Sequence, residues 1–276
     1  MKKKKPDYSH LSPCQPIGIF DSGVGGLTVA RELKRMLPLE NFIYYGDTKH
    51  LPYGDKSPQA IVGYVTKITD FLLSQNCKAI VIACNTATAN ALKEVLELVQ
   101  GRVPVIDVIS PVAEKVAFEI HTNVGVIATK ATVCSGLYKK SIRKHNKFIK
   151  VDELATPLLV PAIEEGFKNH PITHSIIYNY LSSPKLKNIE TLILGCTHYP
   201  LLIEEIRHFY GNRVRVIDSP RIVISALKTE LEQHNLLNTE TKGTYHKFYV
   251  SDLTRNFEKI SKKIFGNSIP LELHPL

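Results

Sequence analysis

The stretch IVIACNT at residues 80–86 has a counterpart 112 positions later, in LILGCTH at residues 192–198. A second pair, IGIF at residues 17–20 and VGVI at residues 124–127, lies 107 positions apart. Two matches at nearly one offset predict a duplicated structural unit, and this offset is too long for a solenoid, whose repeats have ~20–50 residues. We expect the two copies to face each other around a pseudo-two-fold axis.

Short apolar runs alternate with amphipathic stretches along the chain, which is typical of an α/β protein whose parallel strands are buried on both faces. The expected strands are residues 17–20, 42–45, 79–83, 103–106, 124–128, 148–151, 191–194 and 214–217. The expected helices are residues 28–37, 58–74 and 86–99, with two more beginning at Ser110 and Thr156.

The repeat also predicts the domain organisation. Residues 1–15 are expected to be a flexible, lysine-rich extension. Residues 16–108 together with 219–276 would form the first α/β domain, and residues 109–218 the second. The final segment would then extend or cap the first domain, and the active site would lie in the cleft between the two.

Composition limits the class of protein. The 276 residues are 43% hydrophobic, which is enough for a sizeable core. No apolar run approaches the ~18 residues of a membrane span, and no apolar segment follows the first lysines as in a secretory signal. The five cysteines include no CxxC pair, so we expect reduced thiols and a cytoplasmic protein without membrane contact.

The net charge of +9 favours acidic partners and is compatible with weak nucleic-acid binding. A solvated basic surface is the simpler interpretation. The aromatic residues are not interleaved with arginine as they are in base-stacking platforms. We therefore expect no nucleic-acid partner.

Ligands of open parallel sheets bind beyond the carboxyl ends of the strands. The polar residues at those ends are Asp21, Ser22, Cys84, Asn85, Thr86, Thr129, Cys196, Thr197 and His198. Cys84 and Cys196 each end an apolar run at equivalent places in the repeat, so they would reach one cleft from opposite sides. Each would also sit at a helix start, where free N–H groups favour a thiolate. Two such bases could remove a proton from one face of a carbon and return one to the other face.

Other interpretations of these residues exist. A cysteine that ends a buried strand is often a small core hydrophobe. Cys14, Cys77 and Cys134 lack the polar strand-end context of Cys84 and Cys196, and we interpret them as structural or incidental. Structural zinc needs four ligands, usually in two closely spaced pairs. Cys196 and His198 would supply only two, so we expect no metal.

The turn DSGVGGLT at residues 21–28 resembles a dinucleotide-binding turn, but Thr28 replaces the third glycine and Asp21 would repel a pyrophosphate. A carboxylate or ammonium ligand suits this turn better, and a plain glycine turn is the alternative. The backbone N–H groups of Tyr53 and Gly54 could bind a carboxylate, although LPYG at residues 51–54 is also an ordinary turn sequence.

The strings GIFDSGVGGLT (residues 18–28), LPYG (51–54), ACNTA (83–87) and GCTHYPL (195–201) together resemble the glutamate racemases of the aspartate/glutamate racemase family. The resemblance implies a two-domain fold and an isomerase that interconverts L- and D-glutamate without a cofactor. It also implies a role in supplying D-glutamate for peptidoglycan, and hence for cell-wall biogenesis and cell shape. A homodimer and an allosteric cell-wall precursor are the partners that it suggests.

The resemblance also implies roles for individual residues. Cys84 would deprotonate D-glutamate, Cys196 would deprotonate L-glutamate, and Asp21 and His198 would support proton transfer. Glu164 matches a glutamate near the cleft. The implied substrate-binding residues are Asp21, Ser22, Pro52, Tyr53, Gly54, Asn85, Thr86, Thr129, Thr197 and His198.

The sequence departs from the family pattern at Thr156, where many members have cysteine, at Ala128, and in the run at residues 218–221. Related racemases of aspartate or hydantoin, decarboxylases and isomerases could use the same thiols. Decarboxylation needs only one protonating cysteine, so two equivalent thiols favour racemisation.

Overall fold

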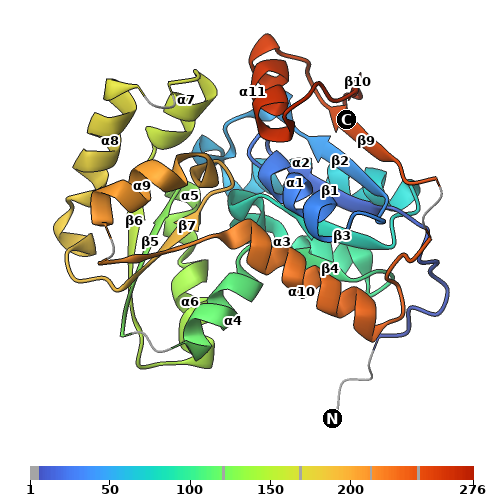
Figure 1. Ribbon diagram of the computed structural model, residues 1–276. Helices are drawn as coiled ribbons and strands as arrows, with labels where there is room; N and C mark the ends of the chain where they lie inside the picture. The colour runs from blue at the N-terminus through green and yellow to red at the C-terminus, as the bar shows by residue number, and fades with distance from the viewer. Residues whose placement is uncertain (1–5, 120–121, 168–169, 212, 241–242) are drawn as a thin grey trace.

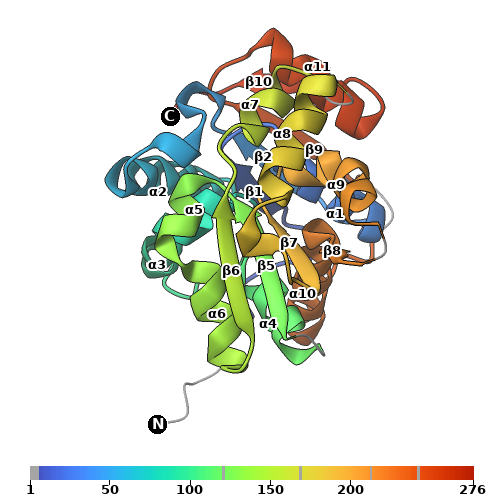
Figure 2. The same cartoon turned by 90° about the vertical axis from the view of Figure 1, so that its left-hand side faces the viewer.

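Two parallel β-sheets form the centre of the protein in the computed structural model, which describes residues 6–119, 122–167, 170–211, 213–240 and 243–276 (Figure 1). The first sheet has the strand order β10-β9-β2-β1-β3-β4. Its strands are β1 (Ile17–Asp21), β2 (Phe42–Gly46), β3 (Ala79–Ile82), β4 (Val105–Asp107), β9 (His246–Val250) and β10 (Leu271–Leu273). The second sheet has the order β6-β5-β7-β8 (Figure 2). Its strands are β5 (Asn123–Ala128), β6 (Lys150–Ala155), β7 (Thr191–Gly195) and β8 (Arg215–Ile217).

Helices connect the strands and cover both sheets. They are α1 (Leu27–Met36), α2 (Pro58–Ser74), α3 (Asn85–Val99), α4 (Ser110–Phe118), α5 (Lys130–Ser135), α6 (Leu137–His145), α7 (Leu159–Glu164), α8 (Pro171–Leu181), α9 (Ile203–Tyr210), α10 (Ser219–Gln233) and α11 (Arg255–Phe265). Short 3₁₀ turns lie at Thr48–His50, Tyr53–Asp55, Pro184–Leu186 and Tyr199–Leu202.

Alternating side chains of the central strand β1 point to opposite faces of the first sheet. Ile17 and Ile19 pack with α1, α10 and α11, whereas Phe20 packs with α2 and α3. Strand β5 does the same in the second sheet, with Val126 toward α4 and α6 and Ile127 toward α7, α8 and α9. Both sheets are therefore covered on two faces, which explains their near-continuous apolar sequences.

The order β2-β1-β3-β4 in one sheet corresponds to β6-β5-β7-β8 in the other. In each set the strand that comes first in the sequence lies between the next two and pairs with them in parallel. The predicted α/β class with two similar parallel-sheet units is confirmed. Strands β9 and β10 join the first sheet beside β2, which supports the domain division that we propose: residues 16–108 with 219–276, and residues 109–218.

Some predicted element bounds were wrong. The strand expected at residues 148–151 is β6 at Lys150–Ala155; β6 lies at the edge of its sheet, where half-buried polar residues are tolerated. The helix expected from Thr156 begins at Leu159. The Thr156 N–H continues the strand ladder instead, because it donates to the carbonyl of Ala128 at 2.9 Å.

The N-terminal segment also differs from the expected extension. Tyr8 is buried in the main core cluster, and Asn41 donates a hydrogen bond to the carbonyl of Cys14. Residues 6–15 therefore pack on the first sheet unit, while Lys2–Lys5 lie outside the described residues. Across the described part of the chain, every helix is too short or too polar to cross a membrane.

Candidate active site

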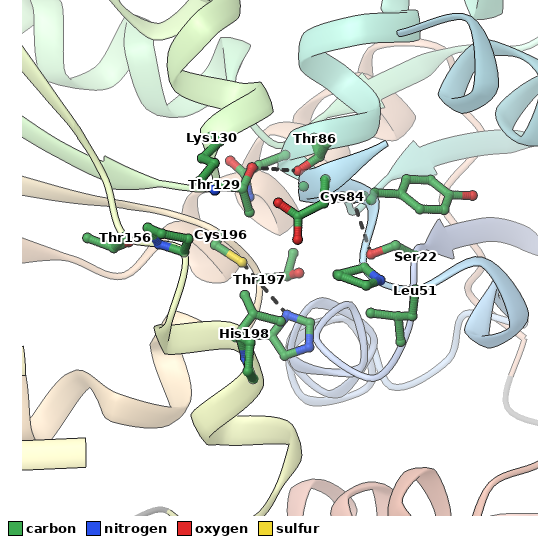
Figure 3. Close-up of a pocket in the computed structure, with 18 residues that line it drawn as sticks. Ser22, Leu51, Cys84, Thr86, Thr129, Lys130, Thr156, Cys196, Thr197 and His198 are labelled. Atoms are coloured by element: carbon green, nitrogen blue, oxygen red, sulfur yellow. Dashed lines mark hydrogen bonds between the residues drawn. The ribbon is translucent and has the colours of Figure 1, made fainter. Parts of the chain in front are cut away.

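A cavity lies at the carboxyl ends of the strands, between the two sheet units (Figure 3). The first unit contributes Ser22, Leu51, Pro52, Tyr53, Gly54, Asp55, Cys84, Asn85 and Thr86. The second contributes Thr129, Lys130, Thr156, Pro157, Val160, Pro161, Cys196, Thr197 and His198. Every substrate-binding residue that the resemblance implied lines this cavity, except Asp21, which is fully buried beside it. In Figure 3, Cys84 lies on the side of Ser22 and Cys196 on the side of Thr156.

Cys84 caps the N-terminus of α3. Its Sγ accepts a hydrogen bond from the Ala87 N–H at 3.4 Å and lies 3.7 Å from the Ser22 hydroxyl. Burial and the nearby Asp21 carboxylate raise the pKa of the Cys84 thiol to about 12, while the Ala87 N–H and the Ser22 hydroxyl oppose this rise. The expected position at a helix start is thus present for Cys84, but its donors do not overcome the cost of burial.

Cys196 has different surroundings. It follows β7, and the 3₁₀ turn after it begins only at Tyr199, with no side-chain cap. Our expectation that Cys196 would sit at a helix start was therefore wrong. Its Sγ instead lies 3.7 Å from His198 Nδ1.

His198 connects Cys196 to Glu164. The second ring nitrogen, Nε2, is 2.6 Å from Glu164 Oε1. Burial alone would lower the pKa of His198, but hydrogen bonds to Cys196 and Glu164 raise the pKa well above the ordinary value. Glu164 does not line the cavity. It contacts only the far side of the imidazole, so it would act through His198.

Asp21 holds the glycine turn together. Its Oδ2 accepts the N–H groups of Gly23 at 3.0 Å and Gly26 at 2.9 Å. Its Oδ1 accepts the Thr197 hydroxyl from the second unit at 3.3 Å. Burial raises the pKa of Asp21, although His198 and these N–H donors oppose the rise. The N–H groups that we expected to hold an external anion therefore hold the protein's own carboxylate.

Gly25 lies where the two units meet. A Cβ added there would be 2.5 Å from His198 Nδ1 and 2.6 Å from the Thr197 hydroxyl oxygen. Only glycine allows this close approach. The sequence showed a glycine-rich turn here, but not that one of its glycines contacts His198.

Hydroxyl and amide groups form another wall of the cavity. The Thr86 and Thr129 hydroxyl oxygens are 2.9 Å apart, and Thr132 lies within 3.4 Å of both. Asn85 accepts a hydrogen bond through Oδ1 from the buried Tyr138 hydroxyl at 2.7 Å. Sequence reasoning missed Thr132 and Tyr138, because both lie inside helices with no strand-end signal.

A model of the family described as Asp/Glu/Hydantoin racemase matches residues 26–227. A glutamate racemase of Chlorobaculum parvum is 42% identical over 261 residues, which cover 94% of this chain and 96% of that protein. The chain belongs to the Asp/Glu/Hydantoin racemase family. The resemblance drawn from the motifs, and with it the prediction of an isomerase of the racemase class, is confirmed.

Solved structures agree with this assignment. Glutamate racemase from Francisella tularensis in complex with D-glutamate has a TM-score of 0.89 and 40% identity, covering 95% of this chain and 98% of that one. Escherichia coli glutamate racemase in complex with L-glutamate and the activator UDP-MurNAc-ala has a TM-score of 0.74 and 26% identity, with 95% and 98% coverage.

Proposed function

We propose that this enzyme interconverts L- and D-glutamate through two cysteines and without a cofactor. The observation that carries the proposal is the placement of Cys84 and Cys196 on opposite sides of one cavity whose lining also presents hydroxyl and amide groups. The relatives support the choice of substrate, since a protein 42% identical to this chain is a glutamate racemase and a structure at 40% identity holds D-glutamate.

The chemical difficulty is the weak acidity of the α-hydrogen of an amino acid. One thiolate removes that proton from one face, and the other thiol delivers its proton to the opposite face, so each turnover exchanges the charge states of the two sulfurs. Donors preorganised around the substrate carboxylate stabilise the carbanion more strongly in a dry cleft than in water. Ser22 and Asn85 supply such side-chain groups on the cavity wall, whereas the Thr197 hydroxyl already donates to Asp21.

The surroundings of the cysteines suggest the resting state. A protonated His198 beside Cys196 stabilises negative charge on that sulfur. The raised pKa of Cys84 keeps that thiol protonated. We propose that Cys84 is a thiol in the resting enzyme, and that Cys196, beside His198, is the residue that acts on L-glutamate.

The deciding experiment is racemisation of L- and D-glutamate in deuterated water by protein freed of metal and pyridoxal. Deuterium at Cα of the inverted product is the expected result. A required metal or cofactor would overturn the cofactor-free scheme. Faster turnover of aspartate or a hydantoin than of glutamate would overturn the proposed substrate.

The wider role is also a proposal. D-glutamate made here would supply peptidoglycan synthesis in the cytoplasm, and all five cysteines are free, as a reducing compartment requires. A homodimer stays a prediction. The E. coli complex with UDP-MurNAc-ala makes that class of cell-wall precursor the activator to test in this enzyme.

A further inference from the structure

Asp47 is a buried acid that lies beside the cavity without lining it. It directly follows β2, and its N–H donates to the Asp21 carbonyl at 3.0 Å. Its Oδ1 accepts the Ser251 hydroxyl at 2.7 Å, and its Oδ2 accepts the Tyr53 hydroxyl at 2.6 Å. His50 Nδ1 lies 2.9 Å from both oxygens. One carboxylate therefore joins three separate side chains.

Tyr53 is the partner that reaches the cavity. It begins the 3₁₀ turn Tyr53–Asp55, all of which lines the cavity, and its side chain is almost fully buried. Burial and the adjacent Asp47 raise the pKa of the Tyr53 phenol, so its hydroxyl stays protonated and donates to the carboxylate. Gly54 in this turn packs against Thr129 of the second unit, because a Cβ at Gly54 would be 3.0 Å from Thr129 Cβ.

Ser251 is the partner that fixes Asp47 from the other side. It follows β9, and its N–H donates to the Gly46 carbonyl at 3.0 Å. Its hydroxyl oxygen also accepts the Lys49 N–H at 3.0 Å. The C-terminal strand β9 lies outside the region matched by the family model, yet through Ser251 and Asp47 it is linked to the wall of the cavity.

We infer that Asp47 is a positioning residue for substrate binding. It holds the turn Tyr53–Asp55 in place by accepting the Tyr53 hydroxyl, and its own position is fixed by the hydrogen bond from Ser251. This inference rests on the proposed function and on the sequence-based expectation that the N–H groups of Tyr53 and Gly54 bind a carboxylate, here one of glutamate. Asp47 itself touches neither the cavity nor the reacting atoms. Its loss should therefore weaken substrate binding more than it slows the chemical steps.

The test combines Asp47→Asn, Tyr53→Phe and the double variant. Asp47→Asn keeps the size of the side chain but removes the charge that strengthens its hydrogen bonds. We expect the KM for L-glutamate to rise about tenfold in Asp47→Asn, with kcat within about twofold. If Asp47 acts through Tyr53, the double variant should be little worse than the poorer single variant, whereas independent effects would multiply.

Asp107→Asn is the matched control. Asp107 is also a buried acid at the end of a strand of the first sheet, but it accepts the N–H groups of Ile109 and Ser110 and does not line the cavity. The same rise in KM in Asp107→Asn would overturn the inference, because it would show a general effect of losing a buried charge. A rise in KM in the double variant equal to the product of the rises in Asp47→Asn and Tyr53→Phe would overturn the inference as well.

A second readout separates this inference from the proposed function. Backbone hydrogen exchange at Lys56, whose N–H donates to the Tyr53 carbonyl at 3.1 Å, should be faster in Asp47→Asn and Tyr53→Phe than in wild type, and unchanged in Asp107→Asn. Unchanged exchange in Asp47→Asn would reject the positioning role even if the enzyme racemises glutamate. A wild-type enzyme that does not racemise glutamate would reject the proposed function, and the exchange data would still test Asp47.

Discussion

The two cysteines occupy equivalent places in a duplicated unit, but different groups surround them. Cys84 caps α3 and meets a backbone N–H and the Ser22 hydroxyl, while Cys196 meets the imidazole of His198, which is held by Glu164. The two sulfurs therefore hold equivalent positions in the repeat but have different electrostatic partners. The comparison shows that equal positions in a fold do not imply equal surroundings.

The largest expected effect comes from removing either sulfur. Cys84→Ser and Cys196→Ser should each reduce racemisation by about 10³-fold or more, because a positioned acid or base contributes ~10²–10⁴-fold. Each variant keeps one thiol, so each should exchange the α-hydrogen of only one enantiomer with deuterated water, slowly and without inversion. Proton NMR of L- and D-glutamate would follow both. Substantial turnover by either variant would contradict the two-base scheme.

Replacing His198 should affect the Cys196 half of the reaction alone. In His198→Asn we expect kcat/KM to fall about 10²-fold. It must fall equally in both directions, because the equilibrium constant between enantiomers is one. The asymmetry should appear in the isotope effect, which becomes larger for α-deuterated L-glutamate than for α-deuterated D-glutamate, as removal of the proton by Cys196 becomes limiting. Equal isotope effects would place His198 outside that step.

The raised pKa of His198 also predicts a pH dependence of stability. A group whose pKa is higher in the folded state stabilises the fold fully below its unfolded pKa, which is about 6.5 for histidine, and loses this effect as pH rises through the folded value. The free energy of unfolding of wild type should therefore exceed that of His198→Asn most at and below about pH 6.5. Urea denaturation at several pH values would measure the difference, and a gap that widens with rising pH would refute the assignment.

Beside Cys84, a smaller effect is expected from Tyr138→Phe. In wild type the Tyr138 hydroxyl donates to Asn85 Oδ1, which leaves the Asn85 amide N–H₂ group for other partners. Without this bond the Asn85 amide can rotate, and we expect the KM for glutamate to rise about fivefold with little change in kcat. Steady-state kinetics would measure both constants. An unchanged KM would mean that the Asn85 amide does not bind the substrate.

Beside Cys196, the smallest effect is expected from Thr156→Cys, which introduces the residue that the family resemblance leads us to expect at this position. Thr156 Oγ1 lies 2.7 Å from the Tyr199 hydroxyl and 3.3 Å from the Ala128 carbonyl. Losing these bonds should cost about 1 kcal/mol of stability while leaving kcat/KM within about twofold. Thermal unfolding and kinetics together check this, and a large loss of activity would give Thr156 a role in the chemistry.

Local sequence patterns were enough to predict the two sheet units and the polar strand ends that meet at the cavity. Apolar runs such as residues 80–82 and 192–194 are short and fall between amphipathic stretches, which favours buried strands, and parallel topology brings their carboxyl ends to one edge. The repeat then related Cys84 to Cys196.

Contacts between residues that are far apart in the sequence could not be predicted from local patterns. The sequence around Asp47 gives no sign of Ser251, which lies 204 residues later. Cys84 caps a helix and Cys196 does not, because the helix after each residue begins at a different distance from it. A glycine or cysteine at the end of a predicted strand does not determine where that helix begins. Asp21 likewise resembles a ligand-binding acid in sequence, although its oxygens are occupied by the neighbouring glycine turn and Thr197.

The matching strand orders of the two sheets have a stereochemical consequence. Each unit contributes one cysteine to the cavity, so under the two-base scheme that we propose either unit alone would detach a hydrogen and put it back only on the side it came from. In that scheme inversion of handedness is a property of the joined pair, because a mirror-image product needs one sulfur from each half on either side of the same molecule.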